Sequence, residues 1–337
     1  MNTDRRRINA PSGGTTPPIF ARTVKVPGYL ESLRPSRTRG PNELRKIFLQ
    51  TGIIPSASGS AYLEVPLPRT SNSSSLIPPR SSLKITCSIQ GPKPLPRSAP
   101  FSPSLLLTTA VKFAPFASRN RRGYIRDSIE RDLGVHLETA LRGVLIGERW
   151  PKSGVEVIVT VVEGDEDGWW GDSTPGIGGG ITGSGMGAGW GLLNILAGCI
   201  TVSSAAIADA GIDCVDLVSG GVAAIVRNPD TKKKEGEKGD FVRMLDPCPA
   251  EHQDIVAACV VGYLAGRDEV TEIWLKGNVG AIPDELIDGA TQAAVGSLSV
   301  LKEVVMEAVE AKFQGQVIQE KEGLKRKHPQ QDAEMVG

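Results

Sequence analysis

The sequence predicts an α+β fold in which helices pack against mixed β-sheets. Over residues 83–90, apolar and polar side chains alternate, which is the period of a half-buried strand. Over residues 129–145, a leucine or isoleucine recurs at every fourth position, which is the period of an amphipathic helix. The segments follow in the order strands, helix, strand, helix, strands, helix, and this order predicts helices packed on mixed sheets.

The first predicted strands lie in the N-terminal half of the chain. One covers residues 59–65, and the alternating strand at 83–90 ends at Gly91-Pro92. Between them, residues 66–80 are rich in Pro and Ser and are expected to form a flexible insertion. Residues 105–113 are the next strand candidate.

The clearest helix follows residue 126. Asp127 and Glu130 resemble a capping box, with Asp in the place of the usual Ser or Thr. The four-residue repeat then predicts a helix that ends at Gly147. Residues 155–162 are rich in β-branched side chains and predict a strand.

An apolar helix is predicted at residues 192–210, ended by Gly211. Before it, residues 171–191 contain ten glycines, and such a stretch is costly to order in regular structure. Residues 190–208 are uncharged and long enough to cross a bilayer. They include Gly, Asn and Ser and lack anchoring residues at their ends, so we expect a buried core helix instead.

The C-terminal half predicts three strands and a long helix. The strands are expected at residues 215–226, 255–264 and 270–275, and Pro283 opens the helix, whose apolar pattern ends at Phe313. The expected organisation is an extended N-terminal arm, one folded domain with three flexible insertions, and a disordered charged tail. Their expected bounds are 1–45 for the arm, 46–315 for the domain, 66–80, 171–191 and 229–240 for the insertions, and 316–337 for the tail.

Charge is unevenly distributed along the chain. Lys plus Arg and Asp plus Glu both number 38, so the net charge indicates no partner. Residues 65–126 nevertheless hold ten basic and no acidic side chains, whereas residues 153–226 hold nine acidic and no basic ones. This asymmetry fits a bound polyanion, a charge-complementary neighbour, or chance in solvated loops.

The five cysteines and three histidines predict no metal site. The cysteines form no CxxC pair and mostly lie in apolar runs, which fits a reducing compartment and no structural zinc. Residues 1–10 have no apolar core, so no secretory signal is expected there. We expect no cofactor.

A set of short motifs in a fixed order resembles the RNase PH-like proteins. The set is Gly59-Ser60-Ala61, Thr86-Cys87, Gly91-Pro92, Arg122-Gly123, Glu130-Arg131-Asp132-Leu133, Leu137 to Arg142, and Ala206 to Ile212. The resemblance spans roughly residues 45–315 and implies an RNase PH-like fold. Residues 4–8 and 97–101 look closest to one subunit of the eukaryotic RNA exosome ring.

Active members of that family carry a Gly-Gly-Thr-Arg-like phosphate loop at the entry of the second helix. Phosphorolysis brings two anions together, so it needs a guanidinium and backbone or hydroxyl donors. The matching place in this sequence is Leu193-Asn194-Ile195-Leu196, which has no Arg, Thr or Gly pair. Apolar side chains cannot pair a desolvated phosphate. The resemblance therefore implies a subunit without catalysis.

Two carboxylates lie where the family has its acidic catalytic residues. Asp246 and Asp254 fall in this region, and Asp254 directly precedes the apolar run 255–261. They are vestigial candidates for holding a metal or moving a proton. An Asp at a strand entry is also a common turn residue.

A basic cluster before the first helix predicts contact with RNA. It consists of Arg119, Arg121, Arg122 and Arg126, with Arg97 as a further member. Phe113, Phe116 and Tyr124 are interleaved and would suit stacking on unpaired bases. A solvated loop or pairing with a neighbouring subunit are the alternatives.

The resemblance implies a structural subunit of the exosome ring that guides RNA. Its partners would be other RNase PH-like ring subunits, cap proteins, a separate nuclease and RNA, with no membrane. It implies a role in ribosomal RNA maturation and messenger RNA turnover, in the nucleus, nucleolus and cytoplasm. The rival hypotheses are an active phosphate-dependent 3′-5′ exoribonuclease and a free RNA-binding protein.

Overall fold

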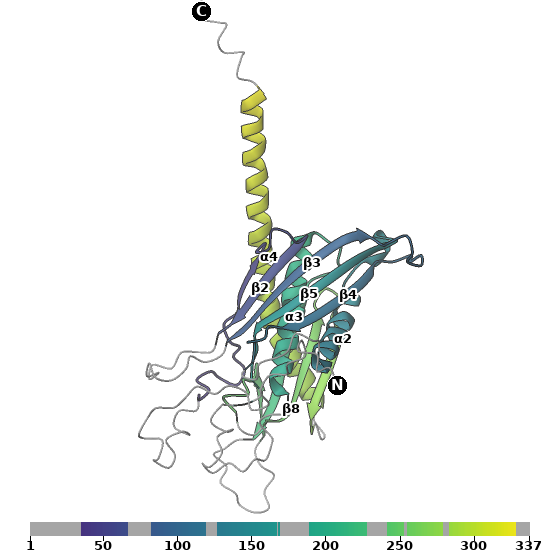
Figure 1. The fold of residues 1–337 in the computed structure, drawn as a ribbon. Coiled ribbons are helices and arrows are strands. Elements are labelled where there is room, and N and C mark those ends of the chain that lie inside the picture. Colours follow the sequence, from purple (N-terminus) through teal and green to yellow (C-terminus); the bar gives the residue numbers. More distant parts are fainter. Residues whose placement is uncertain are drawn as a thin grey trace, which may run out of the picture.

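Two β-sheets and three long helices make up the described part of the chain (Figure 1). The structure is a computed structural model and describes residues 35–66, 82–118, 127–166, 168, 189–227, 241–252, 255–278 and 283–327, with side chains in the last helix as far as Gln314. The first sheet has the order β1-β2-β3-β5-β4 and the second has the order β7-β6-β8-β9. Only the β4–β5 pair is parallel among these strands.

The elements occur in the predicted order. The strands are β1 (Phe48–Thr51), β2 (Gly59–Val65), β3 (Leu83–Pro94), β4 (Leu106–Phe113), β5 (Ser153–Glu163), β6 (Val218–Arg227), β7 (Phe241–Leu245), β8 (Ile255–Leu264) and β9 (Glu269–Gly277). The helices are α2 (Ser128–Arg142), the short 3-10 helix η3 (Gly147–Arg149), α3 (Trp190–Ala210) and α4 (Pro283–Lys327). The short strands β1 and β7 had not been predicted.

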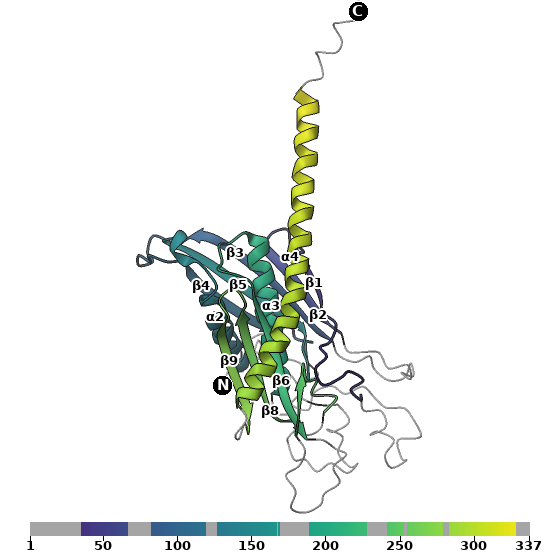
Figure 2. The same cartoon turned by 180° about the vertical axis from the view of Figure 1, so that it is seen from behind.

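The layers alternate between sheet and helix. Helix α3 packs on β2 and β3 of the first sheet and on β6 and β8 of the second, so it lies between the two sheets. Helix α4 covers the opposite face of the second sheet, where Leu286, Ala290 and Ala293 form a separate small core with that sheet. Figure 2 shows α4 running along the back of β6 and β8. The resulting α+β architecture is the one predicted.

Helix α3 is the central element, and its sequence explains why. It is apolar on nearly every side, as a helix enclosed by other elements must be. Its length and composition would suit a membrane span, but 89% of its most apolar window is buried inside the domain. The prediction of a core helix therefore holds. Gly211 ends the helix in the left-handed conformation, with φ of 68°.

Two adjacent glycines in β6 let the helices on both faces of the second sheet come close. A Cβ on Gly220 would lie 2.3 Å from the Ala197 carbonyl oxygen in α3. A Cβ on Gly221 would lie 2.2 Å from the Ala290 carbonyl oxygen in α4. Successive strand residues face opposite sides of the sheet, so Gly220 lies against α3 and Gly221 lies against α4.

Helix α2 begins with the predicted capping box. Asp127 Oδ1 accepts a bond from the Ile129 amide at 2.8 Å, and Glu130 Oε2 accepts one from the Asp127 amide at 3.2 Å. Its other oxygen, Oε1, accepts a bond from the Phe113 amide at 2.8 Å, which ties the end of β4 to the helix. The helix ends at Arg142 rather than Gly147, because residues 147–149 form the separate 3-10 turn.

Other predicted boundaries also differ from the structure. Strand β3 continues through Gly91-Pro92, where it had been expected to end, as far as Pro94. Helix α4 continues to Lys327, where a disordered tail had been expected from residue 316. The Glu, Lys and Gln residues in this stretch are good helix formers, and no proline follows Pro283 until Pro329. At the other end, residues 35–45 of the expected arm pack onto the domain, as described below, while residues 1–34 lie outside the described part.

Candidate functional site

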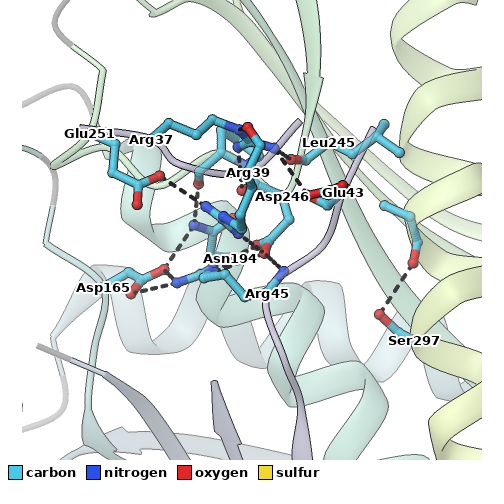
Figure 3. Close-up of polar contacts among 12 residues, drawn as sticks. Arg37, Arg39, Glu43, Arg45, Asp165, Asn194, Leu245, Asp246, Glu251 and Ser297 are labelled. Atoms are coloured by element: carbon cyan, nitrogen blue, oxygen red, sulfur yellow. Dashed lines mark hydrogen bonds and ion pairs between the residues drawn. The ribbon is translucent and has the colours of Figure 1, made fainter. Parts of the chain in front are cut away.

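A buried group of arginines and acids lies where four segments of the chain meet (Figure 3). The segments are the stretch before β1, the residues after β5, the first turns of α3 and the residues after β7. We call this group the arginine–carboxylate cluster, and its members are Arg39, Arg45, Asp165, Asn194, Asp246 and Glu251.

Arg45 is the centre of the cluster and is only 5% exposed. Its Nη1 atom lies 3.0 Å from Asp165 Oδ2, and its Nη2 atom lies 2.7 Å from Asp246 Oδ1. The Nε atom donates to Asp246 Oδ2 at 2.9 Å. One guanidinium thus binds two carboxylates from opposite sides through short, charge-assisted bonds.

Arg39 extends the cluster to a third acid. Its Nη1 atom lies 3.1 Å from Asp246 Oδ2 and its Nη2 atom lies 2.9 Å from Glu251 Oε2. Nearby, Arg37 Nη2 donates to the backbone carbonyls of Glu43 and Leu245, both at 3.0 Å. The arginines of residues 37–45 therefore fasten this segment to the end of β7.

The pKa values in the cluster reflect this pairing. Burial alone would raise the pKa of Asp246, but Arg45 and Arg39 hold it well below its usual range. Burial would likewise lower the pKa of Arg45, but the charges of Asp165 and Asp246 raise it well above its usual value. Both ions therefore stay charged, and each compensates the other. An Asp246 carboxylate held in this way is a poor proton carrier near neutral pH.

Asp246 takes part in the cluster because of its backbone. Its φ of 48° lies in the left-handed region, which Asp tolerates better than most residues. Its amide donates to the Val222 carbonyl at 2.9 Å, so the strand pairing of β6 and β7 fixes its place. The first vestigial candidate is thus an ion-pair partner inside the protein. The second, Asp254, lies outside the described residues.

The place expected for a phosphate loop is part of the hydrophobic core. Leu193, Ile195 and Leu196 are all buried in the first turns of α3. Asn194 is the polar residue of this stretch, and its Nδ2 donates to Asp165 Oδ2 at 2.8 Å and to the Pro247 carbonyl at 2.7 Å. The side chains of these four residues therefore serve packing and the cluster.

A small cavity adjoins the cluster. Its volume is about 50 Å³, and Arg45, Asn194 and Asp246 contribute to its lining. Ligand sites for nucleotide-sized molecules measure roughly 300 Å³ or more, so this cavity is too small for one. Asn194 Oδ1 has no hydrogen-bond partner among the described residues, and an ordered water would suit it.

The described residues contain no cluster of three or more His, Cys, Asp or Glu side chains arranged to hold a metal ion. Their five cysteines are all free. His136 Nδ1 lies 2.7 Å from Glu272 Oε1, and the imidazole ring stacks on Trp274. The His136 side chain therefore joins α2 to β9.

The predicted RNA-contacting residues are only partly described. Arg97 is exposed in the connection between β3 and β4. Arg119, Arg121, Arg122 and Arg126 lie outside the described residues, as does Tyr124. One aromatic residue is corrected: Phe113 is 2% exposed at the end of β4 and cannot stack on a base, because its ring belongs to the core. Phe116 remains exposed.

Sequence reasoning missed the cluster itself. Arg37, Arg39 and Arg45 had been assigned to the extended arm, and Asp165 and Glu251 had been given no role. The density of arginines before the first strand was the available signal, but it did not indicate their acidic partners.

The chain is similar to known proteins over most of its length. The RNase PH family model, described as 3′ exoribonuclease family, domain 1, matches residues 43–213. The chain belongs to the RNase PH family. This match begins just before Arg45 and runs through α3, so it includes three of the four segments that form the cluster.

Within the family, the chain is an exosome ring subunit of the MTR3 type. It is 47% identical over 318 residues to the exosome complex component MTR3 of Chaetomium thermophilum, covering 91% of this chain and 99% of that protein. The mtr3 component of Schizosaccharomyces pombe is 28% identical over 279 residues, covering 81% of this chain and 84% of the relative. The earlier resemblance at residues 4–8 and 97–101 pointed to this same subunit.

A solved structure supports the fold. The crystal structure of rice (Oryza sativa) Rrp46 aligns with a TM-score of 0.54 at 16% identity, covering 80% of this chain and 98% of the rice chain.

Proposed function

We propose that this exosome subunit is structural and does not itself catalyse phosphorolysis. The observation that carries the proposal is the arginine–carboxylate cluster. Catalysis would need a free cation for phosphate and free carboxylates for a metal or a proton. In the cluster, Arg45 and Arg39 are bound to Asp165, Asp246 and Glu251 instead. Leu193 and Leu196 replace the donors of a phosphate loop.

The subunit would act by completing the ring and by guiding RNA. Arg97 is exposed, and residues 65–126 hold ten basic and no acidic side chains, of which Lys84 is paired with Glu163. Contacts to phosphates would bind RNA with little sequence preference and strong salt dependence. Replacing Arg97 and Arg122 with Gln should therefore weaken RNA crosslinking to the ring and reduce its salt dependence.

The wider role follows from membership of the exosome. We infer that the chain contacts other RNase PH-like subunits directly and helps to dock cap proteins and a separate nuclease. It would thereby support ribosomal RNA maturation and messenger RNA turnover in the nucleus, nucleolus and cytoplasm. Native mass spectrometry on a tagged copy should recover a hetero-oligomer of several RNase PH-like chains. A homo-oligomer or a lone monomer would contradict this role.

An activity assay separates the structural subunit from its enzymatic rival. The ring would be reconstituted without any added nuclease, and 3′-labelled RNA would be incubated with inorganic phosphate. We expect no nucleoside diphosphate release that depends on this chain. Release that requires phosphate and is abolished by Asp254→Asn in this subunit would establish a phosphorolytic enzyme instead.

A further inference from the structure

The distal segment of α4, residues 302–314, extends past the last buried turn of the helix. Among the side chains of α4 that the structure describes, Leu301 is the last that is fully buried, and Val304 and Val305 are only partly buried. Figures 1 and 2 show the C-terminal part of α4, in yellow, rising above both sheets from either viewing direction.

One ion pair fixes the rotation of this segment about its own axis. Lys312 Nζ lies 2.7 Å from Asp209 Oδ1 and donates to the Asp209 carbonyl at 3.1 Å, at the C-terminal end of α3. A cation at the end of a helix is favoured by the helix dipole. The face of α4 that carries Lys312 therefore points to α3, and the faces on either side of it are set.

An apolar stripe runs along the face of the helix next to the one that carries Lys312. Met306, Val309 and Phe313 are spaced by three and four residues, so they lie on one side of the helix. They are 64%, 43% and 64% exposed. A row with this spacing is the narrow seam by which one helix packs against another.

An acidic row borders the stripe. Glu303, Glu307 and Glu310 are also spaced by four and three residues, and all three are exposed. Glu303 and Glu310 are three and four positions from Met306, which makes them its neighbours on the helix surface. Like charges at this spacing repel, and no ion pair engages these acids within the described residues. A basic partner would relieve that repulsion.

We propose that the distal segment of α4 binds an amphipathic helix of a partner protein whose apolar stripe is flanked by Lys or Arg. The stripe is as narrow as the seam between two packed helices, so it fits a partner helix better than a flat partner surface. The acidic row selects basic flanks and disfavours RNA, because carboxylates repel phosphates. The proposal is independent of whether the subunit is catalytic.

Defined peptides test this proposal on the full chain. The probe is a fluorescein-labelled peptide of about three heptads with Leu at positions a and d and Lys at e and g. The matched probe has Glu at e and g. Fluorescence anisotropy should show binding of the Lys peptide at least about tenfold tighter than that of the Glu peptide.

Two variants make the result specific. The double change Met306→Glu with Phe313→Glu should weaken the Lys peptide at least about tenfold. The triple change E303K, E307K and E310K should reverse the preference between the peptides. The matched control is Phe101→Glu with Val135→Glu, two residues that are 73% and 62% exposed elsewhere on the surface. It should bind both peptides as the unaltered chain does.

Three outcomes would overturn the proposal. One is unchanged binding in the Met306 and Phe313 variant, and another is an unchanged preference in the charge-reversed variant. The third is a concentration-dependent dimer in sedimentation that the Met306 and Phe313 variant abolishes, because the stripe would then bind a second copy of this chain. Circular dichroism should show all variants equally folded, since the changed side chains are exposed.

Discussion

A single guanidinium, that of Arg45, holds together parts of the chain that are far apart in sequence. Its two carboxylate partners, Asp165 and Asp246, lie 120 and 201 residues away. Ions removed from water cost several kcal/mol each, and only close pairing compensates that cost. The cluster therefore adds little net stability. It instead constrains the fold, because removing one of its ions would leave the partner ions buried without compensation.

Replacing Arg45 with Met should strongly destabilise the domain. The variant leaves Asp165 and Asp246 buried with less or no compensation, and the loss of unfolding free energy should be about 3–5 kcal/mol. Urea denaturation followed by circular dichroism measures it. Arg142→Met, at an exposed pair with Glu138, is the control and should cost less than about 1 kcal/mol. A cost for Arg45→Met as small as that of the control would mean that water reaches the cluster.

His252 should make stability depend on pH. Burial, with the charges of Arg37 and Arg39, lowers its pKa from 6.5 to about 4. Between these values the unfolded chain binds a proton that the folded chain does not, so the free energy of unfolding falls as pH decreases. The fall should be of the order of 2 kcal/mol between pH 6.5 and 4. Asp246, whose folded pKa lies below 3.8, adds a further loss at lower pH.

Urea titrations at several pH values measure this effect. His252→Gln should flatten the dependence between pH 6.5 and 4 and leave the steep loss at lower pH in place. If the variant kept the same slope in the upper range, another group would be responsible for it.

At the scale of elements, close backbone approach decides how the helices sit on the second sheet. Gly220 and Gly221 are neighbours in β6, and each has a helix backbone pressed against it on one face. In this arrangement α3 is buried between the two sheets, and the second sheet is covered by a helix on each face. The ion pair of Lys312 with Asp209 then joins the C-terminal end of α3 to α4.

Gly221→Ala should separate α4 from the sheet. The added methyl would meet the carbonyl oxygen of Ala290 and the amide of Ala294, each at 2.2 Å, and helix backbone cannot yield as a side chain can. We expect a loss of about 2–3 kcal/mol in unfolding free energy. The control is Gly134→Ala in α2, where the nearest atom is 3.8 Å away. That change should stabilise by up to about 1 kcal/mol through helix propensity. A neutral Gly221→Ala would show that α4 shifts freely on the sheet.

At the scale of the whole molecule, α3 packs against both sheets and joins them into one folded unit. Most core residues of both sheets belong to a single cluster that includes α3, while α4 adds a smaller core on the outer face. The arginine–carboxylate cluster also joins segments next to both sheets. Neither sheet can therefore lose its packing without disturbing the other.

The described domain should accordingly unfold in one cooperative step. Urea transitions followed by circular dichroism and by tryptophan fluorescence should coincide, as they do for two-state domains. The measurement can be repeated with Gly221→Ala, which perturbs only the α4 side. Two separated transitions in the unaltered chain would mean that the sheets are independent folding units.

Much of the architecture was determined by local sequence patterns. The alternating residues 83–90, the capping box at Asp127 and the glycine after α3 each specify their element, because side-chain period and backbone preference act within a few residues. The short edge strands β1 and β7 carry too few residues for such a pattern. That Leu193–Leu196 carry apolar side chains where the family resemblance led us to expect a phosphate loop was also readable, since it depends only on residue types at one place.

The sequence by itself determined the α+β fold and its family. Only the tertiary structure decided that Arg39 and Arg45 belong to the core and that Asp246 is their partner. It also decided that Phe113 is buried and that α4 continues beyond the domain. Periodicity records which way a side chain points from its own element, but ion pairing depends on which distant elements meet, and no local pattern encodes that meeting.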